Sequence, residues 1–351
     1  MIVTGPGIAR ESTRLIVVGW AQAKKNFLRE PDGLVDISDP KADLSGIAPK
    51  DAKDLLPFDV PAGEIKQIWI NIHVPDGSRA GIYTGNISVE PEGLTEIELP
   101  VSLEVLPIKL APPALEYSIF FMGKLSKDGL PNISTRKIQW LSQEQYLAQM
   151  KNLLEHGADN PLSYAYQGKE EYFRREMLLR EQAGMPKRDL YILTTDDARV
   201  DRQEDEAGLE KLRAGVKWYV DFARENGYRD VYVFSHPDEP SVEQIKKEGK
   251  ATKAAHEVGA KTFVPIGPDI YEIAGADIDL SKLLDVFIVA GPPKPEMAQA
   301  VHRGGGRIMC YANPQVGVEE PLTYRRNFGL LLWKAGYDGT MNFAYQYAFD
   351  H

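Results

Sequence analysis

Two adjacent carboxylates are the residues of this sequence best placed to do chemistry. Asp238 and Glu239 lie between two prolines, in the run Pro237-Asp238-Glu239-Pro240. Like charges held side by side raise the pKa of at least one carboxyl group, and a carboxyl group that stays protonated near neutral pH can act as a general acid. The prolines disfavour helix at the residues before them and favour a turn. The alternative is that residues 237–241 are the entry to a helix, where the helix dipole also favours acids.

The segments around the acid pair predict the fold that positions it. After residue 113, eight apolar segments have the length of buried strands, and amphipathic segments separate most of them. The strand segments are 116–122, 159–164, 190–195, 230–235, 261–266, 285–290, 307–312 and 339–346, and the helical segments are 141–156, 168–184, 205–226, 241–257, 294–303 and 322–336. Eight such repeats predict an α/β chain folded as a TIM-like (β/α)8 barrel. Active sites of this fold lie at the C-terminal ends of the strands, and the fourth strand runs directly into Asp238 and Glu239.

The residues that follow the seventh strand limit which group can be the nucleophile. In many barrel glycosidases the acid follows strand four and a carboxylate nucleophile follows strand seven, but here no acid follows Tyr311 until Glu319. The nucleophile can then belong to the substrate, as the carbonyl oxygen of a 2-acetamido group. In that scheme Glu239 protonates the leaving oxygen and later acts as the base, while Asp238 stabilises the oxazolinium ion.

Two alternatives stay open. The first is a glycosidase for sugars without an acetamido group, either inverting or with a second carboxylate from Asp196, Asp197 or Asp269. The second is a non-catalytic carbohydrate-binding barrel.

Other side chains near the strand ends are candidate substrate-binding residues, because sugars bind to aromatic faces and planar polar groups. These candidates are Tyr311, Asn313, Tyr345, Trp333, Tyr347, His236 and Tyr164. Packing in the core or at the rim is the alternative for the aromatic members, and Trp333 lies on an apolar helix face. The expected partner is a glycan or glycoconjugate substrate.

Residues 1–112 have a different pattern. Segments 65–74, 81–89 and 95–105 have strand character and are separated by turns at 75–77 and 91–93. Short strands with closely spaced turns predict an antiparallel β-sandwich. Pro112 and Pro113 mark its end, because consecutive prolines stop a strand and stiffen a linker. We therefore expect a sandwich over 1–112, with part of it missing, and a catalytic barrel over 113–351 that lacks its last helix.

Three segments carry a family resemblance. Residues 68–75 (IWINIHVP) and 80–87 (AGIYTGNI) resemble the β-sandwich of glycoside hydrolase family 123 and its DUF4091-type relatives. Residues 324–339 look like the same group's last helix and strand, so the resemblance extends over most of the chain. The family's characterised activity is a retaining, substrate-assisted β-N-acetylgalactosaminidase. Its adjacent Asp-Glu pair matches Asp238 and Glu239, so the resemblance implies the same roles for these two residues.

Composition excludes several other classes of function. The net charge of −10 argues against a nucleic-acid partner. The single cysteine, Cys310, permits no internal disulfide, and its apolar neighbours predict a buried side chain. The six histidines have no metal-ligand spacing, so we expect neither a metal nor a cofactor. No apolar run is long enough to insert into a membrane. No leader is visible, which leaves a cytoplasmic location and secretion with a removed leader both open, and the oligomeric state is not indicated.

Overall fold

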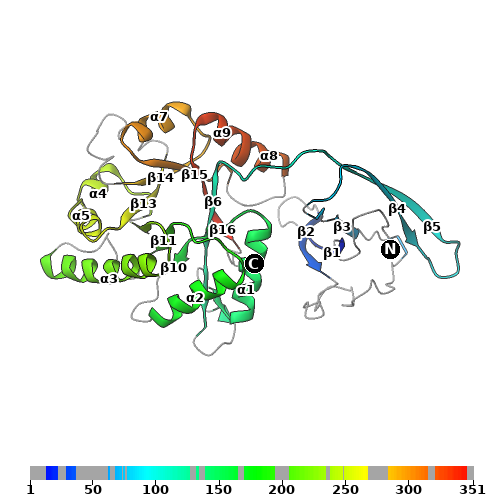
Figure 1. The fold of residues 1–351 in the computed structure, drawn as a ribbon, viewed down its shortest axis with the longest axis horizontal. Helices are drawn as coiled ribbons and strands as arrows, with labels where there is room; N and C mark the ends of the chain where they lie inside the picture. Colours follow the sequence, from blue (N-terminus) through cyan, green and yellow to red (C-terminus); the bar gives the residue numbers. More distant parts are fainter. Residues whose placement is uncertain are drawn as a thin grey trace. The chain divides into compact units, whose positions relative to one another are not determined.

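A computed structural model of the chain describes residues 13–22, 29–36, 62–63, 68–72, 74–75, 77–126, 132–133, 139–164, 170–193, 205–234, 238–247, 249–267, 284–314 and 321–345. The chain divides into two compact units, Met1–Ala111 and Pro112–His351 (Figure 1). The division falls at the pair of prolines, where the sequence pattern also changes.

The first unit contains antiparallel strands. Strands β1 (Thr13–Gln22), β2 (Arg29–Asp36) and β3 (Ile68–Ile72) pair in the order β2-β1-β3, and β4 (Gly81–Val89) pairs with β5 (Ile97–Val105) as a hairpin. The hairpin register places Ile87 opposite Leu99, and Val89 opposite Ile97, so one hairpin face is apolar. Such a face needs a covering layer. Packing of one sheet on the other as a sandwich stays a prediction.

The second unit is an eight-stranded parallel sheet that curves into a nearly closed barrel. Its strands are β6 (Glu116–Phe121), β10 (Ser163–Tyr164), β11 (Leu190–Leu193), β12 (Val231–Phe234), β13 (Lys261–Ile266), β14 (Val286–Ala290), β15 (Arg307–Tyr311) and β16 (Gly339–Tyr345), and β16 pairs with β6. Between β10 and β6, the N–H of Leu162 donates to the carbonyl oxygen of Ile119 at 3.0 Å. Each predicted strand segment contains one of these strands, so the predicted TIM-like barrel is confirmed.

Helices cover the outside of the barrel (Figure 1). They are α1 (Gln143–Glu155), α2 (Glu170–Gln182), α3 (Glu206–Glu225), α4 (Val242–Lys247), α5 (Gly249–Glu257), α7 (Pro295–Arg303), α8 (Pro321–Arg325), the π-helix η5 (Arg326–Leu330) and α9 (Leu331–Ala335). The helix predicted over 241–257 is divided into α4 and α5, and that over 322–336 contains the π-helical turn. A small sheet of β7 (Gly123–Leu125), β8 (Asn132–Ile133) and β9 (Gln139–Leu141) follows β6.

Side-chain alternation divides the core into an inner cluster and outer layers. On β12, Tyr232 faces the inner cluster, whereas Val231 and Val233 pack in an outer layer beneath the helices. This is the period-two pattern of a strand that is buried on both faces.

A polar network closes the N-terminal end of the barrel. Arg307, the first residue of β15, lies 2.5 Å from Glu116 and 3.3 Å from Asp189, and it donates to the Tyr191 hydroxyl at 3.1 Å. Each of these residues lies at or near the start of a strand. Because the partners neutralise one another, we assign this buried network to stability and look for chemistry at the other end.

Candidate active site

The C-terminal ends of the strands form a mainly apolar layer. Six partly buried side chains pack against the inner cluster, each within two residues of the end of a strand: Tyr164, Leu193, Phe234, Ala290, Ala312 and Phe343. Only Tyr164 among them was predicted from the sequence as a site residue. The other five could have been found from the sequence by following the alternation of inward and outward residues to the end of each predicted strand. A substrate at this end of the barrel would rest on this apolar layer.

Asp238 and Glu239 lie on the turn between β12 and α4. Helix α4 begins only at Val242, and Ser241 precedes it with a reciprocal pair of hydrogen bonds to Gln244, which is a capping box. The two acids therefore lie in the segment that leads into the helix and not in its first turn, so the helix-entry alternative describes their position and does not by itself decide their function. Both side chains are exposed, and the Pro240 that follows them is buried.

The backbone at Glu239 has an unusual conformation. Its φ is 49°, in the left-handed region that residues other than glycine rarely adopt. Such conformations persist where the surrounding structure fixes them, and they cluster at active sites. The conformation turns the chain between the two acids and the helix.

Tyr311 reaches Glu239 from the seventh strand of the barrel. Its hydroxyl donates a hydrogen bond to Oε1 of Glu239. Tyr311 is the last residue of β15 and is only 4% exposed. Burial, the hydrogen bond with Glu239 and the charges of Glu239 and Asp238 all raise the pKa of Tyr311 above its usual value. The hydroxyl therefore stays protonated and serves as a fixed donor to the carboxylate from across the barrel.

Strand β16 holds the turn that follows Tyr311. Ala312 also has a φ of 49°, and its N–H donates to Oδ1 of the buried Asn342 at 3.0 Å. On the same strand, Thr340 donates to the carbonyl oxygen of Cys310 at 2.8 Å. Asn342 was not predicted as a site residue. A polar residue among apolar ones in a buried strand is the signal that could have indicated it.

Asn313 joins the end of β15 to the π-helix. Nδ2 of Asn327, a residue of η5, donates to the main-chain oxygen of Asn313 at 2.9 Å and approaches its Oδ1 at 3.4 Å. The Asn313 side chain also contacts the Cys310 thiol, whose pKa burial raises to about 12. Cys310 is buried, as predicted. Asn313 thus fixes the loop beside Tyr311, and the contacts of its side chain are with the helix layer.

The other predicted substrate-binding residues have different positions. The Tyr164 hydroxyl donates to Sδ of Met122 at 2.9 Å, and Nζ of Lys124 lies 5.5 Å from the Tyr164 ring, so Tyr164 stays at the C-terminal end of the barrel. Tyr345 lies in the helix layer, because its hydroxyl donates to Oδ1 of Asn152 on α1 at 3.1 Å.

Two corrections follow for the aromatic candidates. Tyr345 is removed from the candidate site, since its hydroxyl is directed to α1. Trp333 is 65% exposed, so the expected burial on an apolar helix face is wrong, and it lies on α9, which leads into the N-terminal end of β16 and not its C-terminal end. His236, Tyr347, Asp196, Asp197 and Asp269 lie outside the residues that the structure describes.

The site thus combines two exposed carboxylates with a buried tyrosine hydroxyl. This set can donate and accept protons and can stabilise a positive charge. Across the described ranges, no three His, Cys, Asp or Glu side chains gather as a metal site. None of the helices in the described part of the chain is long and apolar enough to cross a membrane.

No family model matches the sequence, and no curated protein is similar to it in sequence. Among solved structures, a D-psicose 3-epimerase of Clostridium cellulolyticum is 9% identical with a TM-score of 0.40, covering 66% of this chain and 84% of that one. A family 113 β-mannanase of Alicyclobacillus acidocaldarius is 10% identical with a TM-score of 0.39, covering 67% and 88%.

An O-GlcNAc hydrolase of Thermobaculum terrenum is 9% identical with a TM-score of 0.38 over 65% of this chain, which spans 55% of the hydrolase. Identity and TM-score are too low in all three cases for the likeness to bear on the activity of this chain.

Proposed function

We propose that the chain is a retaining exo-β-N-acetylhexosaminidase that uses the 2-acetamido group of its substrate as the nucleophile. The observation that carries the proposal is the hydrogen bond from Tyr311 to Glu239. It joins the ends of strands four and seven, and it places a tyrosine where a two-carboxylate enzyme of this fold would have its nucleophile.

The residues at the end of β15 support a substrate nucleophile. Residues 311–314 are Tyr, Ala, Asn and Pro, and none of them can attack the anomeric carbon as a carboxylate. A retaining enzyme with two carboxylates needs them about 5 Å apart on opposite sides of the glycosidic bond. Asp238 and Glu239 are adjacent on one turn and cannot flank the bond in that way.

The proposed first step breaks the bond between C1 and the leaving oxygen. Glu239 gives its proton to that oxygen, while the acetamido carbonyl oxygen forms a bond to C1 and produces an oxazolinium ion. Asp238 accepts a hydrogen bond from the acetamido N–H, and its negative charge stabilises the cation. In the second step Glu239 takes a proton from water, which attacks C1 and reopens the ring with net retention.

Tyr311 acts as a positioning residue in this scheme. Its donor bond to Oε1 of Glu239 leaves Oε2 to carry the transferred proton. The left-handed turn at Ala312 and the bond to Asn342 hold Tyr311 in place from the neighbouring strand. Pre-set geometry of this kind lowers the reorganisation needed during the reaction.

The resemblance to glycoside hydrolase family 123 supports the choice of sugar. It concerns residues in both units of the chain and includes the adjacent acid pair. It favours N-acetylgalactosamine over N-acetylglucosamine, two sugars that differ in configuration at C4. The described side chains do not distinguish between them.

A panel of 4-nitrophenyl glycosides, with and without a 2-acetamido group, tests the proposal. We expect turnover of the acetamido sugars alone, with inhibition by a thiazoline mimic of the oxazoline. Glu239→Gln should slow substrates with poor leaving groups far more than activated ones, because general acid catalysis contributes roughly 10²–10⁴-fold. Turnover of a non-acetamido glycoside without thiazoline inhibition would overturn the proposal. Sugar binding without turnover, unchanged in Glu239→Gln, would indicate a binding module.

A further inference from the structure

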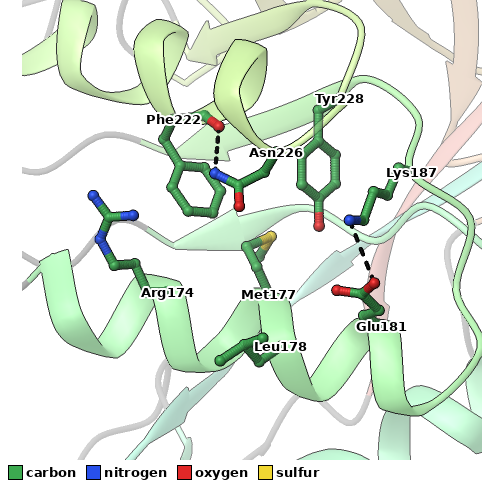
Figure 2. Close-up of a pocket in the computed structure, with 8 residues that line it drawn as sticks. All are labelled: Arg174, Met177, Leu178, Glu181, Lys187, Phe222, Asn226 and Tyr228. Carbon is green, nitrogen blue, oxygen red and sulfur yellow. Dashed lines mark hydrogen bonds and ion pairs between the residues drawn. The ribbon is translucent and has the colours of Figure 1, made fainter.

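A small pocket lies between α2 and α3, toward the end of the barrel opposite the candidate active site (Figure 2). Most of its lining comes from the last turns of the two helices and from the loops that lead into the N-terminal ends of β11 and β12. Its volume is about 180 Å³. Sites that enclose drug-sized ligands measure roughly 300–1,000 Å³, so this pocket fits a single substituted ring.

One end of the pocket carries an open cation. The guanidinium of Arg174 lies 5.3 Å from the ring centres of both Trp218 and Phe222. Within the described part of the chain, no carboxylate lies at ion-pair distance from it. Stacking on aromatic rings holds the guanidinium plane and leaves its N–H edge available for a planar anion such as a carboxylate.

The other end of the pocket carries a donor and an acceptor. Nζ of Lys187 lies 3.4 Å from Oε1 of Glu181 and 6.0 Å from the centre of the Tyr228 ring. Figure 2 shows this pair at the opposite end of the pocket from Arg174. A half-exposed ion pair of this kind can bind neutral hydroxyl groups, because the ammonium donates and the carboxylate accepts.

Polar and apolar groups face each other between the two ends. Figure 2 shows the Tyr228 hydroxyl and the Asn226 side chain directed toward Met177 and Leu178 of α2. Nδ2 of Asn226 donates to the carbonyl oxygen of Phe222 at 2.8 Å. Neither Oδ1 of Asn226 nor the Tyr228 hydroxyl has a hydrogen-bond partner among the residues that the structure describes. Leu178 is 51% exposed and offers an apolar surface beneath them.

We propose that this pocket binds one acidic sugar residue of a glycan. The ring lies over Leu178, the carboxylate binds Arg174, and the hydroxyl groups bind Tyr228 and Asn226 and, at the far end, the Lys187–Glu181 pair. A neutral sugar would leave the Arg174 edge without an anion. A free carboxylate or phosphate would be too small to reach both ends. The site is separate from the acid pair, so the proposal stands whether or not the barrel hydrolyses glycosides.

Calorimetric titration of the full chain with methyl β-D-glucuronide tests this inference. Arg174→Gln should weaken binding roughly tenfold or more, because a hydrogen bond to a charged group is lost. Tyr228→Phe should weaken it a few-fold. Arg175→Gln is the matched control, because Arg175 is an exposed neighbour on α2 that does not line the pocket. This variant should bind the glucuronide with the same affinity as the wild type.

Three outcomes would overturn the inference. If methyl β-D-glucoside binds as tightly as the glucuronide, the sugar carboxylate does not contribute to binding. Acetate binding as tightly would reduce the pocket to an isolated anion contact. Unchanged glucuronide affinity in both Arg174→Gln and Tyr228→Phe, with unaltered thermal unfolding, would place the ligand elsewhere. Turnover of an activated aryl glycoside by Arg174→Gln should equal that of the wild type, which separates this test from that of the active site.

Discussion

Tyr311→Phe removes one hydroxyl from the candidate site and keeps the ring that packs in the inner cluster. The lost contact is the bond to Oε1 of Glu239. A hydrogen bond to a charged group contributes about 1.5–3 kcal/mol. At about 1.36 kcal/mol for each factor of ten, loss of the whole bond in the transition state lowers kcat by about 10- to 150-fold. KM should change little, because a positioning residue acts on the catalytic group and not on the bound sugar.

The assay is steady-state hydrolysis of 4-nitrophenyl N-acetyl-β-D-galactosaminide by four proteins: the wild type, Tyr311→Phe, Glu239→Gln and the double variant. Because Tyr311 acts through Glu239, the double variant should be no slower than Glu239→Gln alone. Tyr191→Phe is the matched control. It removes a hydroxyl from the same inner cluster at the other end of the barrel, where the hydroxyl accepts from Arg307, so it should affect stability and leave kcat unchanged.

Two results would refute the reasoning. Full activity of Tyr311→Phe would show that the hydrogen bond has no part in catalysis. Effects that multiply in the double variant would show that Tyr311 acts on the substrate independently of Glu239.

Two further predictions concern stability. In Gly339→Ala the new Cβ would lie 2.2 Å from the main-chain oxygen of Glu116, which cannot move without breaking the β16–β6 pairing, so urea denaturation should show a loss of about 1–3 kcal/mol. Gly329→Ala has nothing within 4 Å of its new Cβ and should change stability by less than about 1 kcal/mol. Equal losses in the two variants would contradict the argument. Burial raises the pKa of Glu176 to about 7 from its usual value of 4.5, against the opposing effects of Arg180 and Tyr146. The folded chain then holds this proton more tightly than the unfolded chain, so stability should fall by up to about 3 kcal/mol as the pH rises from 4.5 to 7. Glu176→Gln should lack this slope in urea denaturation, and parallel slopes in the two proteins would contradict it.

The barrel was predictable because its signals are local. Each strand is a short apolar run bounded by turn residues, and each helix repeats apolar residues at helical spacing, as Tyr146, Met150 and Leu153 do on α1. Chain order then determines which strands are neighbours. The acid pair was found for the same reason, since it directly follows a strand whose end could be predicted.

Contacts between distant strands were not predictable in the same way. Asn342 fixes Ala312 across 30 residues, and only the register of β15 against β16 brings the two together. Tyr345 looked like a site residue because it ends a strand. Its hydroxyl lies on the helix side because inward and outward positions alternate, and the register changes between Asn342 and Tyr345.

Two tyrosines of the inner cluster show what decides function in this barrel. Tyr191 and Tyr311 are both buried and both face inward, and burial raises the pKa of each, so neither residue type nor environment distinguishes them. Their partners do. Tyr191 accepts from Arg307, which is itself held by Glu116 and Asp189 in a network with no exposed acid. Tyr311 donates to one oxygen of an exposed carboxylate. The same side chain is therefore structural at one end of the barrel and a candidate for catalysis at the other, and the difference lies in whether its partner is buried with it or exposed.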